Sequence, residues 1–420
     1  MITEKAPGKL YIAGEYAVVE NGYPAILVAL DQFVTCTIKD SAREVGQIIS
    51  QQYTNDQLNW RRMGDRMVVD KRDNPFSYIL SAIRITEEYA RSFERELRIY
   101  DMQIDSQLDS ANGRKYGLGS SAAVTVATVK ALCHYYHLPV TKDEIFKLAA
   151  IAHFEVQGNG SLGDVAASVY GGWISYHSFD RQWLAQQRKY LDLKSLIDLP
   201  WPDLKIESLK APENLELLIG WTGKPASTSQ LVDKISLFKA RQQDEYHRFL
   251  EDSRACIQRM VEGFHQQDLD TIKREIRFNR HLLKQLGTNS GVDIETPVLN
   301  RLCQIAEHFG GAAKTSGAGG GDCGIVAIDR SADFKAVLKS WTKEKIEQAV
   351  APTKREETPP LKITLMEEDL RPYFPDKRTT IPDVKRGVLE ALDLRKKALE
   401  RQKAKAQADK DGKKKPEPSR

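Results

Sequence analysis

A glycine-rich turn that leads directly into an apolar helical run constrains this chain more than any other segment. Residues 117–123 read GLGSSAA, and an Ala/Val-rich run follows them. Glycines allow the backbone to approach a ligand closely, and the unpaired N–H groups and dipole of a helix start favour an anion. Ser120 and Ser121 add hydroxyls that could cap the helix, contact a phosphate oxygen or bind Mg²⁺. The segment predicts a phosphate-binding site and, as a first hypothesis, a phosphoryl-transfer enzyme.

The size and composition of the chain fit a two-domain cytoplasmic protein. It has 420 residues, of which 41% are hydrophobic, which is ample for a large core. Its N-terminus does not resemble a signal peptide, and no apolar run is long enough to cross a bilayer. The five cysteines are scattered and lack the spacing of a metal site, so we expect reduced thiols.

Basic residues gather at the C-terminal end. The formal net charge of the chain is +4, but residues 395–420 hold 11 Lys/Arg and 4 Asp/Glu. The body is therefore slightly acidic, and overall charge gives no reason to expect a nucleic-acid partner. From about residue 367, prolines and low-complexity charged sequence predict a disordered or marginally helical tail over 367–420. A nucleic-acid role would have to rest on that tail, and Lys-rich ends are usually solvated.

The order of the predicted elements indicates an α+β fold, with strands early and helices later. Periodicity and composition predict strands over 9–19, 25–38, 100–108, 168–179, 215–221, 325–328 and 361–366. Helices are predicted over 75–94, 122–137, after a capping box at 141–144, over most of 227–309 and from the last loop to about residue 349.

Four glycine-containing segments stand out, although each alone is more often a structural turn. They are 7–15 (PGKLYIAGE), 117–123 (GLGSSAA), 158–163 (GNGSLG) and 317–324 (GAGGGDCG). Residues 158–163 match GxGxxG but follow a helical segment instead of a strand, so they do not indicate a dinucleotide site. The chain has no GxxxxGK[ST] and no HRD or DFG, which excludes P-loop kinases and protein kinases.

Read together and in this order, these segments resemble the GHMP kinase superfamily over roughly residues 1–350. Within it the chain is most similar to the phosphomevalonate kinases, through GKLYIAGEYAVVE (8–20), KYGLGSS (115–121), GNGSLGD (158–164), SFDRQ (178–182), GWT (220–222) and KTSGAGGGDCGI (314–325). The resemblance implies a two-domain α+β fold with the active site in the cleft between an N-terminal domain (1–180) and a C-terminal domain (181–366).

The same resemblance implies ATP and Mg²⁺ as cofactors and phosphomevalonate as the acceptor. It matches Lys9 and Asp164 to the catalytic residues of the family. It assigns the nucleotide phosphates to Gly117, Leu118, Gly119, Ser120, Ser121 and Ala122, with Ser120 or Ser121 also binding Mg²⁺. It places substrate contacts at Tyr16, Lys115, Ser161, Ser229, Gly317, Gly319 and Gly320.

One position departs from the pattern of the related mevalonate kinases. Those enzymes carry a Mg²⁺-binding glutamate on the helix before the catalytic aspartate, and His153 matches that position here. Glu155 is nearby but off register, so we interpret it as an ordinary exposed helical glutamate. No protein carboxylate is therefore assigned to the metal.

The nature of the acceptor decides what Asp164 has to do. An alcohol would need a base to take its proton. A phosphate monoester is already mostly dianionic at neutral pH, since its second pKa is about 6. Cations then matter most, and Lys9 and Lys115, with Arg114 and Lys224, meet that need. Asp164 would then orient Lys9 or bind a proton transiently, and both roles remain open.

Three alternatives accompany this hypothesis. The first is mevalonate kinase or another small-molecule kinase of the superfamily. The second is an inactive sensor with residues 367–420 as an interaction arm, against which the presence of both Lys9 and Asp164 argues. The third is nucleic-acid binding through the tail. The sequence predicts no particular oligomeric state and no membrane partner.

Overall fold

The structure is a computed structural model and describes residues 1–50, 57–71, 74–108, 117–222, 228–321 and 323–348. Contacts along the chain divide it into Met1–Pro360 and Leu361–Arg420, and the fold described below belongs to the first unit. The predicted strand at 361–366 and the predicted tail lie outside the described residues. The predicted domain division at residue 180 and the tail boundary at residue 366 stay predictions.

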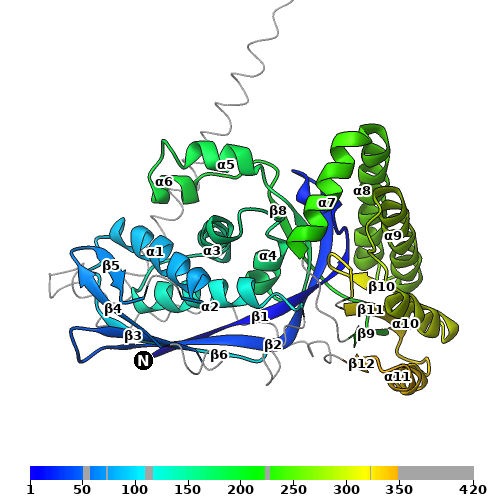
Figure 1. Cartoon of the computed structure of the whole chain (residues 1–420), viewed down its shortest axis with the longest axis horizontal. Coiled ribbons are helices and arrows are strands. Elements are labelled where there is room, and N and C mark those ends of the chain that lie inside the picture. The colour runs from blue at the N-terminus through cyan, green and yellow to red at the C-terminus, as the bar shows by residue number, and fades with distance from the viewer. Residues whose placement is uncertain (51–56, 72–73, 109–116, 223–227, 322, 349–420) are drawn as a thin grey trace, which may run out of the picture. The chain divides into compact units, whose positions relative to one another are not determined.

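A large sheet forms the base of the N-terminal part of this unit (Figure 1). Its strands are β1 (Ile2–Ala13), β2 (Pro24–Asp40), β3 (Gly46–Ser50), β4 (Gln57–Met63), β5 (Arg66–Val69), β6 (Tyr100–Ser106), β7 (Trp173–His177) and β8 (Lys205–Leu209). They run in the order β5-β4-β3-β6-β2-β7-β8, with β1 paired to β2. The pairing of β3 with β6 is parallel and the other described pairings are antiparallel.

Helices cover one face of this sheet (Figure 1). They are α1 (Ser77–Arg91), α2 (Ser120–Tyr135), α3 (Lys142–Gln157), α4 (Gly163–Tyr170), α5 (Arg181–Gln187) and α6 (Leu193–Asp198). Helices α2 and α4 lie on β1 and β2, and α1 and α3 pack on α2. Small residues let α2 lie close to the sheet, since Ala122, Ala123 and Ala127 are fully buried. The predicted capping box is confirmed at the start of α3, where Thr141 and Glu144 bond each other's backbone N–H groups.

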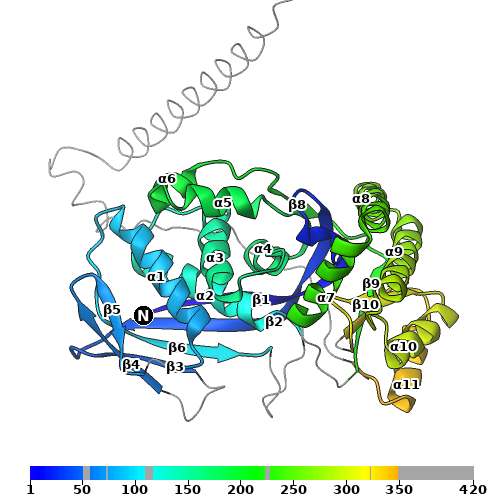
Figure 2. The same cartoon turned by 45° about the horizontal axis from the view of Figure 1, so that its top comes forward.

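The C-terminal part builds a second, smaller sheet. Its strands are β9 (Leu215–Trp221), β10 (Ala312–Ser316), β11 (Cys323–Asp329) and β12 (Glu347–Gln348), in the order β10-β11-β9-β12. Its helices are α7 (Thr228–Arg241), α8 (Gln243–His265), α9 (Leu269–Ser290), α10 (Pro297–His308) and α11 (Phe334–Lys343). Helices α9 and α10 pack on this sheet, and α8 packs on α9 (Figure 2). Contacts of β1 with β10 and of α8 with β2 join it to the large sheet.

Two predicted strands have different limits in the structure. The strand predicted over 9–19 ends at Ala13, because Gly14 (φ 95°) and Tyr16 (φ 63°) turn the chain into the short 3-10 helix η1 (Ala17–Val19). The strand predicted over 168–179 begins only at Trp173. The residues up to Tyr170 are helical, with the Ser168 hydroxyl donating to the Pro7 carbonyl at 2.8 Å.

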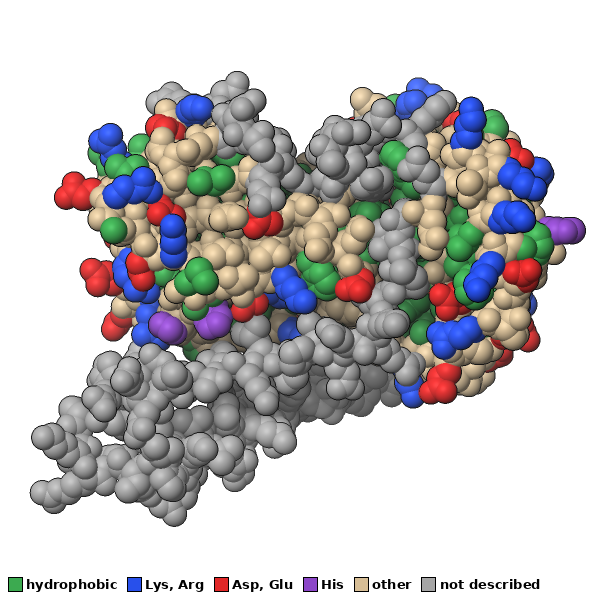
Figure 3. All heavy atoms as spheres, turned by 90° about the horizontal axis from the view of Figure 1, so that it is seen from below, with side chains coloured by type: hydrophobic (Ala, Val, Ile, Leu, Met, Phe, Trp, Pro, Cys, Tyr) green, Lys and Arg blue, Asp and Glu red, His purple; other side chains and the backbone are tan. Residues whose placement is uncertain are grey.

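The remaining global predictions can be compared directly with the described residues. None of the described helices combines the length and apolar character that a bilayer crossing requires. All five cysteines are buried and none of the five forms a disulfide, as expected for reduced thiols. On the described atoms of the face drawn in Figure 3, acidic and basic side chains are interspersed, so that face offers no single-sign patch.

Candidate active site

The start of α2 is built as an anion site from backbone groups. Gly117 (φ 71°) and Gly119 (φ 82°) both adopt the left-handed region, and Gly119 is the residue at which the helix begins. No side chain of the described residues caps this helix end. The N–H groups of the first turn, from Ser120 onward, therefore point out of the helix toward any ligand placed before it.

Strand β1 holds the glycine-rich loop and places Lys9 beside it. The Lys9 N–H donates to the Leu118 carbonyl at 2.8 Å. A Cβ on Gly119 would lie 2.9 Å from Lys9 Cε, so the lysine side chain passes directly over that glycine. Lys9 Nζ is 5.3 Å from the ring centroid of Tyr11. Lys9 therefore lies beside the glycine-rich loop, and its catalytic role stays a prediction.

Asp164 lies in the first turn of α4, which the chain enters through Leu162 in the left-handed region (φ 64°). Its carboxylate accepts the Val165 N–H at 3.0 Å and is half-buried. The negative charge of Asp164, after burial, raises the pKa of Tyr11 and of Tyr78. Asp164 therefore lies near Tyr11, and the Lys9 ammonium lies over the Tyr11 ring.

Tyr11 links the two predicted catalytic residues, and the sequence analysis did not single it out. Its hydroxyl and the Ser161 hydroxyl are 2.8 Å apart, and Ser161 is 7% exposed. Burial raises the Tyr11 pKa far above its ordinary value, so the phenol stays protonated at neutral pH. The sequence did contain a signal for this role of Tyr11. Side chains alternate along a strand, so Lys9 and Tyr11, two residues apart, lie on the same face.

Residues 317–321 form the third glycine-rich loop, which packs against the end of β1. The Tyr16 hydroxyl donates to the Ala318 carbonyl at 2.5 Å, and the Gly317 N–H donates to Glu15 at 3.3 Å. Glu15 also pairs with Lys314, and both side chains are buried. Gly319 is required for packing, since a Cβ there would lie 2.2 Å from the Ile294 carbonyl oxygen.

Ser121 is held by neighbours from two helices. His153 Nε2 lies 3.3 Å from its hydroxyl, and the centroid of the Tyr78 ring lies 4.9 Å from that of His153. The Ser121 hydroxyl opposes the rise in the Tyr78 pKa that burial causes. His153 is fully buried, and burial lowers its pKa although Asp164 opposes the shift. The imidazole is therefore neutral at neutral pH and forms part of the wall behind Ser121. Glu155 is exposed and pairs with Arg84, which confirms its interpretation as a surface glutamate.

Several predicted contacts cannot be placed. Lys115 and the accessory cations Arg114 and Lys224 lie outside the described residues. Ser229 is in the first turn of α7, but its side chain is not among those described. The described residues contain no cluster of three or more His, Cys, Asp or Glu that would hold a metal by themselves. Mg²⁺ keeps several waters and binds largely through substrate phosphates, so the serine hydroxyls at the start of α2 fit its requirements.

Two family models and several known proteins resemble this chain in sequence. The family models "GHMP kinases N terminal domain" and "GHMP kinases C terminal" match residues 77–172 and 260–347. The chain is 38% identical over 351 residues to a phosphomevalonate kinase from Streptomyces sp. (strain CL190), covering 81% of this chain and 94% of that protein. It is 30% identical to a mevalonate kinase from Methanocaldococcus jannaschii, covering 82% of this chain and 97% of that one.

Solved structures agree with the sequence comparisons. The protein Lin0012 from Listeria innocua superposes with a TM-score of 0.79 at 39% identity, covering 84% of this chain and 98% of that one. Phosphomevalonate kinase from Streptococcus pneumoniae, in complex with phosphomevalonate and AMPPNP, superposes with a TM-score of 0.73 at 30% identity, covering 83% and 98%. The fold, the order of the glycine-rich segments and these likenesses agree. The chain belongs to the GHMP kinase family.

Proposed function

We propose that this chain is an ATP-dependent phosphomevalonate kinase. It transfers the γ-phosphoryl group of ATP to (R)-5-phosphomevalonate and yields (R)-5-diphosphomevalonate and ADP, a step on the way to isopentenyl diphosphate. The observation that carries the proposal is the 38% identity to a phosphomevalonate kinase across 81% of the chain. The similarity to a phosphomevalonate kinase bound to phosphomevalonate and AMPPNP supports it.

The start of α2 would bind the phosphates of ATP. Its exposed first-turn N–H groups, the close approach allowed by Gly117 and Gly119, and the helix dipole all favour the polyphosphate. The Lys9 ammonium, next to Gly119, would lie beside the transferred phosphoryl group and neutralise the charge that gathers there. Leu118 contributes the carbonyl that fixes the loop to Lys9.

The acceptor would lie between Ser161, Tyr16 and the third glycine-rich loop. An oxygen of its phosphate forms the new bond to the γ-phosphorus while the bond from that phosphorus to the β,γ-bridging oxygen breaks, and ADP leaves with that oxygen. Because a phosphate monoester is mostly dianionic above its second pKa of about 6, no strong base is needed. Asp164 would orient the Lys9 ammonium, with the Tyr11 ring and hydroxyl fixing the distance between them.

Mg²⁺ would be held by ATP phosphate oxygens together with a hydroxyl from Ser120 or Ser121. When bound, it would neutralise phosphate charge and align the polyphosphate. Between the serines, Ser121 already has His153 as a partner. We therefore favour Ser120 for the metal and Ser121 for fixing the helix start.

A second candidate function is mevalonate kinase, which the 30% identity to the Methanocaldococcus jannaschii enzyme favours. The two are separated by measuring ADP release with mevalonate and with phosphomevalonate side by side, using the same protein preparation and MgATP concentration. A higher kcat/KM for phosphomevalonate supports the proposal. A higher value for mevalonate overturns it, and ATP binding without ADP release with either acceptor supports an inactive sensor.

We also propose a cytoplasmic location for this kinase. Five buried cysteines that form no disulfide are typical of proteins kept in a reducing compartment. Cell fractionation followed by immunodetection tests this proposal. Recovery with the membrane or secreted fraction would contradict it.

A further inference from the structure

Arg181, in the SFDRQ segment (178–182), bonds two backbone carbonyls that come from separate parts of the site. Its Nη1 donates to the Gly160 carbonyl at 3.1 Å, and its Nη2 donates to the Val19 carbonyl. Gly160 directly precedes Ser161, and Val19 ends the η1 turn that begins after Tyr16. One guanidinium thus joins the two turns that carry the predicted acceptor contacts.

We propose that Arg181 is a positioning residue, which holds the Tyr16 turn and the Gly160–Ser161 turn at a fixed separation and so assembles the acceptor side of the site. The proposal rests on the proposed function for the identity of the acceptor. The hydrogen bonds of Arg181 go to the Gly160 and Val19 carbonyls and not to Lys9 or Asp164. It acts through Ser161 and Tyr16.

Both turns need an external restraint. Tyr16 has φ 63° and ψ −52°, which is a costly backbone region for a residue other than glycine. Gly160 has φ 97° and lies in an irregular segment between α3 and α4. Carbonyls in such segments have no place in a helix or sheet ladder and need another donor when buried. A planar guanidinium offers two fixed donors for this purpose, whereas a lysine ammonium is a single point.

A second pair of bonds from the same segment supports the first. The Ser178 hydroxyl donates to the Glu20 carbonyl at 2.6 Å, and the Gly22 N–H donates to the Ser178 carbonyl at 2.7 Å. Ser178 is fully buried. Ser178 and Arg181 therefore bond the backbone carbonyls of Glu20 and Val19, on either side of the end of η1.

The positions held in this way are those that contact the rest of the site. Ser161 bonds the Tyr11 hydroxyl at 2.8 Å, and Tyr16 bonds Ala318 in the third glycine-rich loop at 2.5 Å. A shift of either turn would therefore move groups on both sides of the acceptor. Misplacement by about 1 Å can cost on the order of 10²-fold in rate even when the altered residue is remote from the chemistry.

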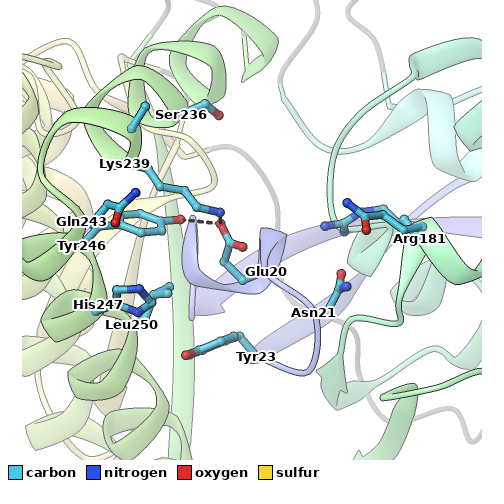
Figure 4. A pocket seen from close by; sticks show the side chains of 12 residues that line it. Glu20, Asn21, Tyr23, Arg181, Ser236, Lys239, Gln243, Tyr246, His247 and Leu250 are labelled. Atoms are coloured by element: carbon cyan, nitrogen blue, oxygen red, sulfur yellow. Dashed lines mark hydrogen bonds and ion pairs between the residues drawn. The ribbon is translucent and has the colours of Figure 1, made fainter.

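The opposite side of the Val19–Tyr23 turn is held more weakly. Figure 4 shows Glu20 between Arg181 on one wall of a cavity of about 790 Å³ and Lys239 and Tyr246 on the other. The Glu20 carboxylate bonds Lys239 Nζ at 2.7 Å and the Tyr246 hydroxyl at 3.1 Å. The Lys239 side chain is 47% exposed, and such ion pairs contribute little in water. The firmer attachments of the turn are therefore those through Arg181 and Ser178.

The test compares Arg181→Lys with Arg188→Lys. Arg188 follows the end of the same helix α5 and makes a bidentate pair with Glu88 at 2.7 and 2.6 Å, so it controls for the loss of a forked bond outside the site. For each variant we would measure kcat, the KM of both substrates, the Kd of phosphomevalonate by calorimetry without ATP, and Tm. Arg181→Lys should lower kcat/KM for phosphomevalonate at least about tenfold and weaken its Kd, with the ATP KM within about twofold.

Arg188→Lys should leave all kinetic constants within about twofold of wild type, even if its Tm falls as much as that of Arg181→Lys. Ser178→Ala, a milder change, should shift the phosphomevalonate KM in the same direction by about fivefold or less. Unchanged acceptor constants in folded Arg181→Lys, a rise in the ATP KM alone, or equal kinetic losses in both arginine variants would each overturn the proposal. If wild type prefers another acceptor, the proposed function fails, and the same ratios measured with that acceptor still decide the role of Arg181.

Discussion

The donor side and the acceptor side of this site are built in different ways. At the donor side, Gly117, Gly119 and the start of α2 present backbone N–H groups, and a backbone bond from Lys9 to Leu118 holds the loop. At the acceptor side, side chains bridge remote segments, as in the bonds of Tyr11 to Ser161 and of Tyr16 to Ala318. A site made from backbone requires particular residues in a short stretch, whereas a site made from side chains requires a whole fold.

Mutations at the two sides of the site should therefore affect different substrates. A change at the donor side should affect ATP and leave the acceptor constants nearly intact. A change at the acceptor side should do the reverse. Lys9 lies between the two sides, above Gly119 and beside Tyr11, so it should affect the chemical step itself.

The largest effect is expected for Lys9→Met, which removes the charge and keeps the length of the side chain. We expect kcat to fall by about 10²–10³-fold, the size seen when a group stabilising transition-state charge is lost, with little change in the ATP KM. Steady-state ADP release measures this. Lys5→Met is the matched control, since Lys5 lies on the same strand over the Phe33 ring and should retain wild-type kcat. Near-normal turnover of Lys9→Met would place the catalytic charge elsewhere.

Gly119→Ala should give the next largest effect, confined to the donor side. The added Cβ would meet Lys9 Cε at 2.9 Å and would force a left-handed backbone that costs about 1–2 kcal/mol for other residues. We expect the ATP KM to rise by about tenfold, since 1.4 kcal/mol corresponds to one decade.

The matched control is Gly64→Ala. Gly64 has φ 59° and nothing within 4 Å of the added carbon, so it bears similar backbone strain without a clash. It should lower Tm only. A rise in the phosphomevalonate KM of Gly119→Ala equal to that of ATP would break the separation between donor and acceptor sides.

Tyr11→Phe should have a smaller effect on the acceptor side. It removes the hydroxyl that bonds Ser161 but keeps the ring beside Lys9. Losing one hydrogen bond of about 1 kcal/mol should raise the phosphomevalonate KM by about fivefold and leave the ATP KM unchanged. Tyr136→Phe, which loses a buried bond to Glu87 away from the site, controls for stability. An effect of Tyr11→Phe on ATP alone would assign Tyr11 to the donor side.

Glu155→Gln should have the smallest effect. Its partner is Arg84, and both side chains are partly exposed, so the pair contributes at most about 1 kcal/mol to stability. We expect kcat and the Mg²⁺ concentration for half-maximal rate to match wild type. A higher Mg²⁺ requirement would show that Glu155 reaches the metal after all.

The sequence predicted the helix after the glycine turn closely, whereas the acceptor contacts were predicted only by resemblance. The helix predicted over 122–137 is observed at Ser120–Tyr135, since a glycine turn followed by small apolar residues has few other structures available. Strands β3, β4 and β5 were not predicted, because they have only five, seven and four residues and polar side chains interrupt their apolar positions. The pairings of Arg181 with Val19 and Gly160 could not be predicted, since they depend on which segments the fold brings together.

The role of His153 also could not be predicted from the sequence. Alignment with the mevalonate kinases indicated that a metal-binding glutamate is replaced there, but gave the histidine no role. The structure shows it fully buried behind Ser121, within 3.3 Å of the serine hydroxyl. Its burial and its partner come from α1, α2 and α3 together, and the local sequence around His153 contains no sign of them.

The central claim is that phosphoryl transfer ends on a phosphate group held at the acceptor side. The most direct measurement is ³¹P nuclear magnetic resonance of wild-type enzyme with MgATP and phosphomevalonate as the reaction proceeds. The account predicts that the phosphomonoester signal disappears while ADP and a second pair of mutually coupled diphosphate signals appear. A new phosphomonoester signal, which would mean transfer to a hydroxyl, or inorganic phosphate with an unchanged acceptor would contradict it.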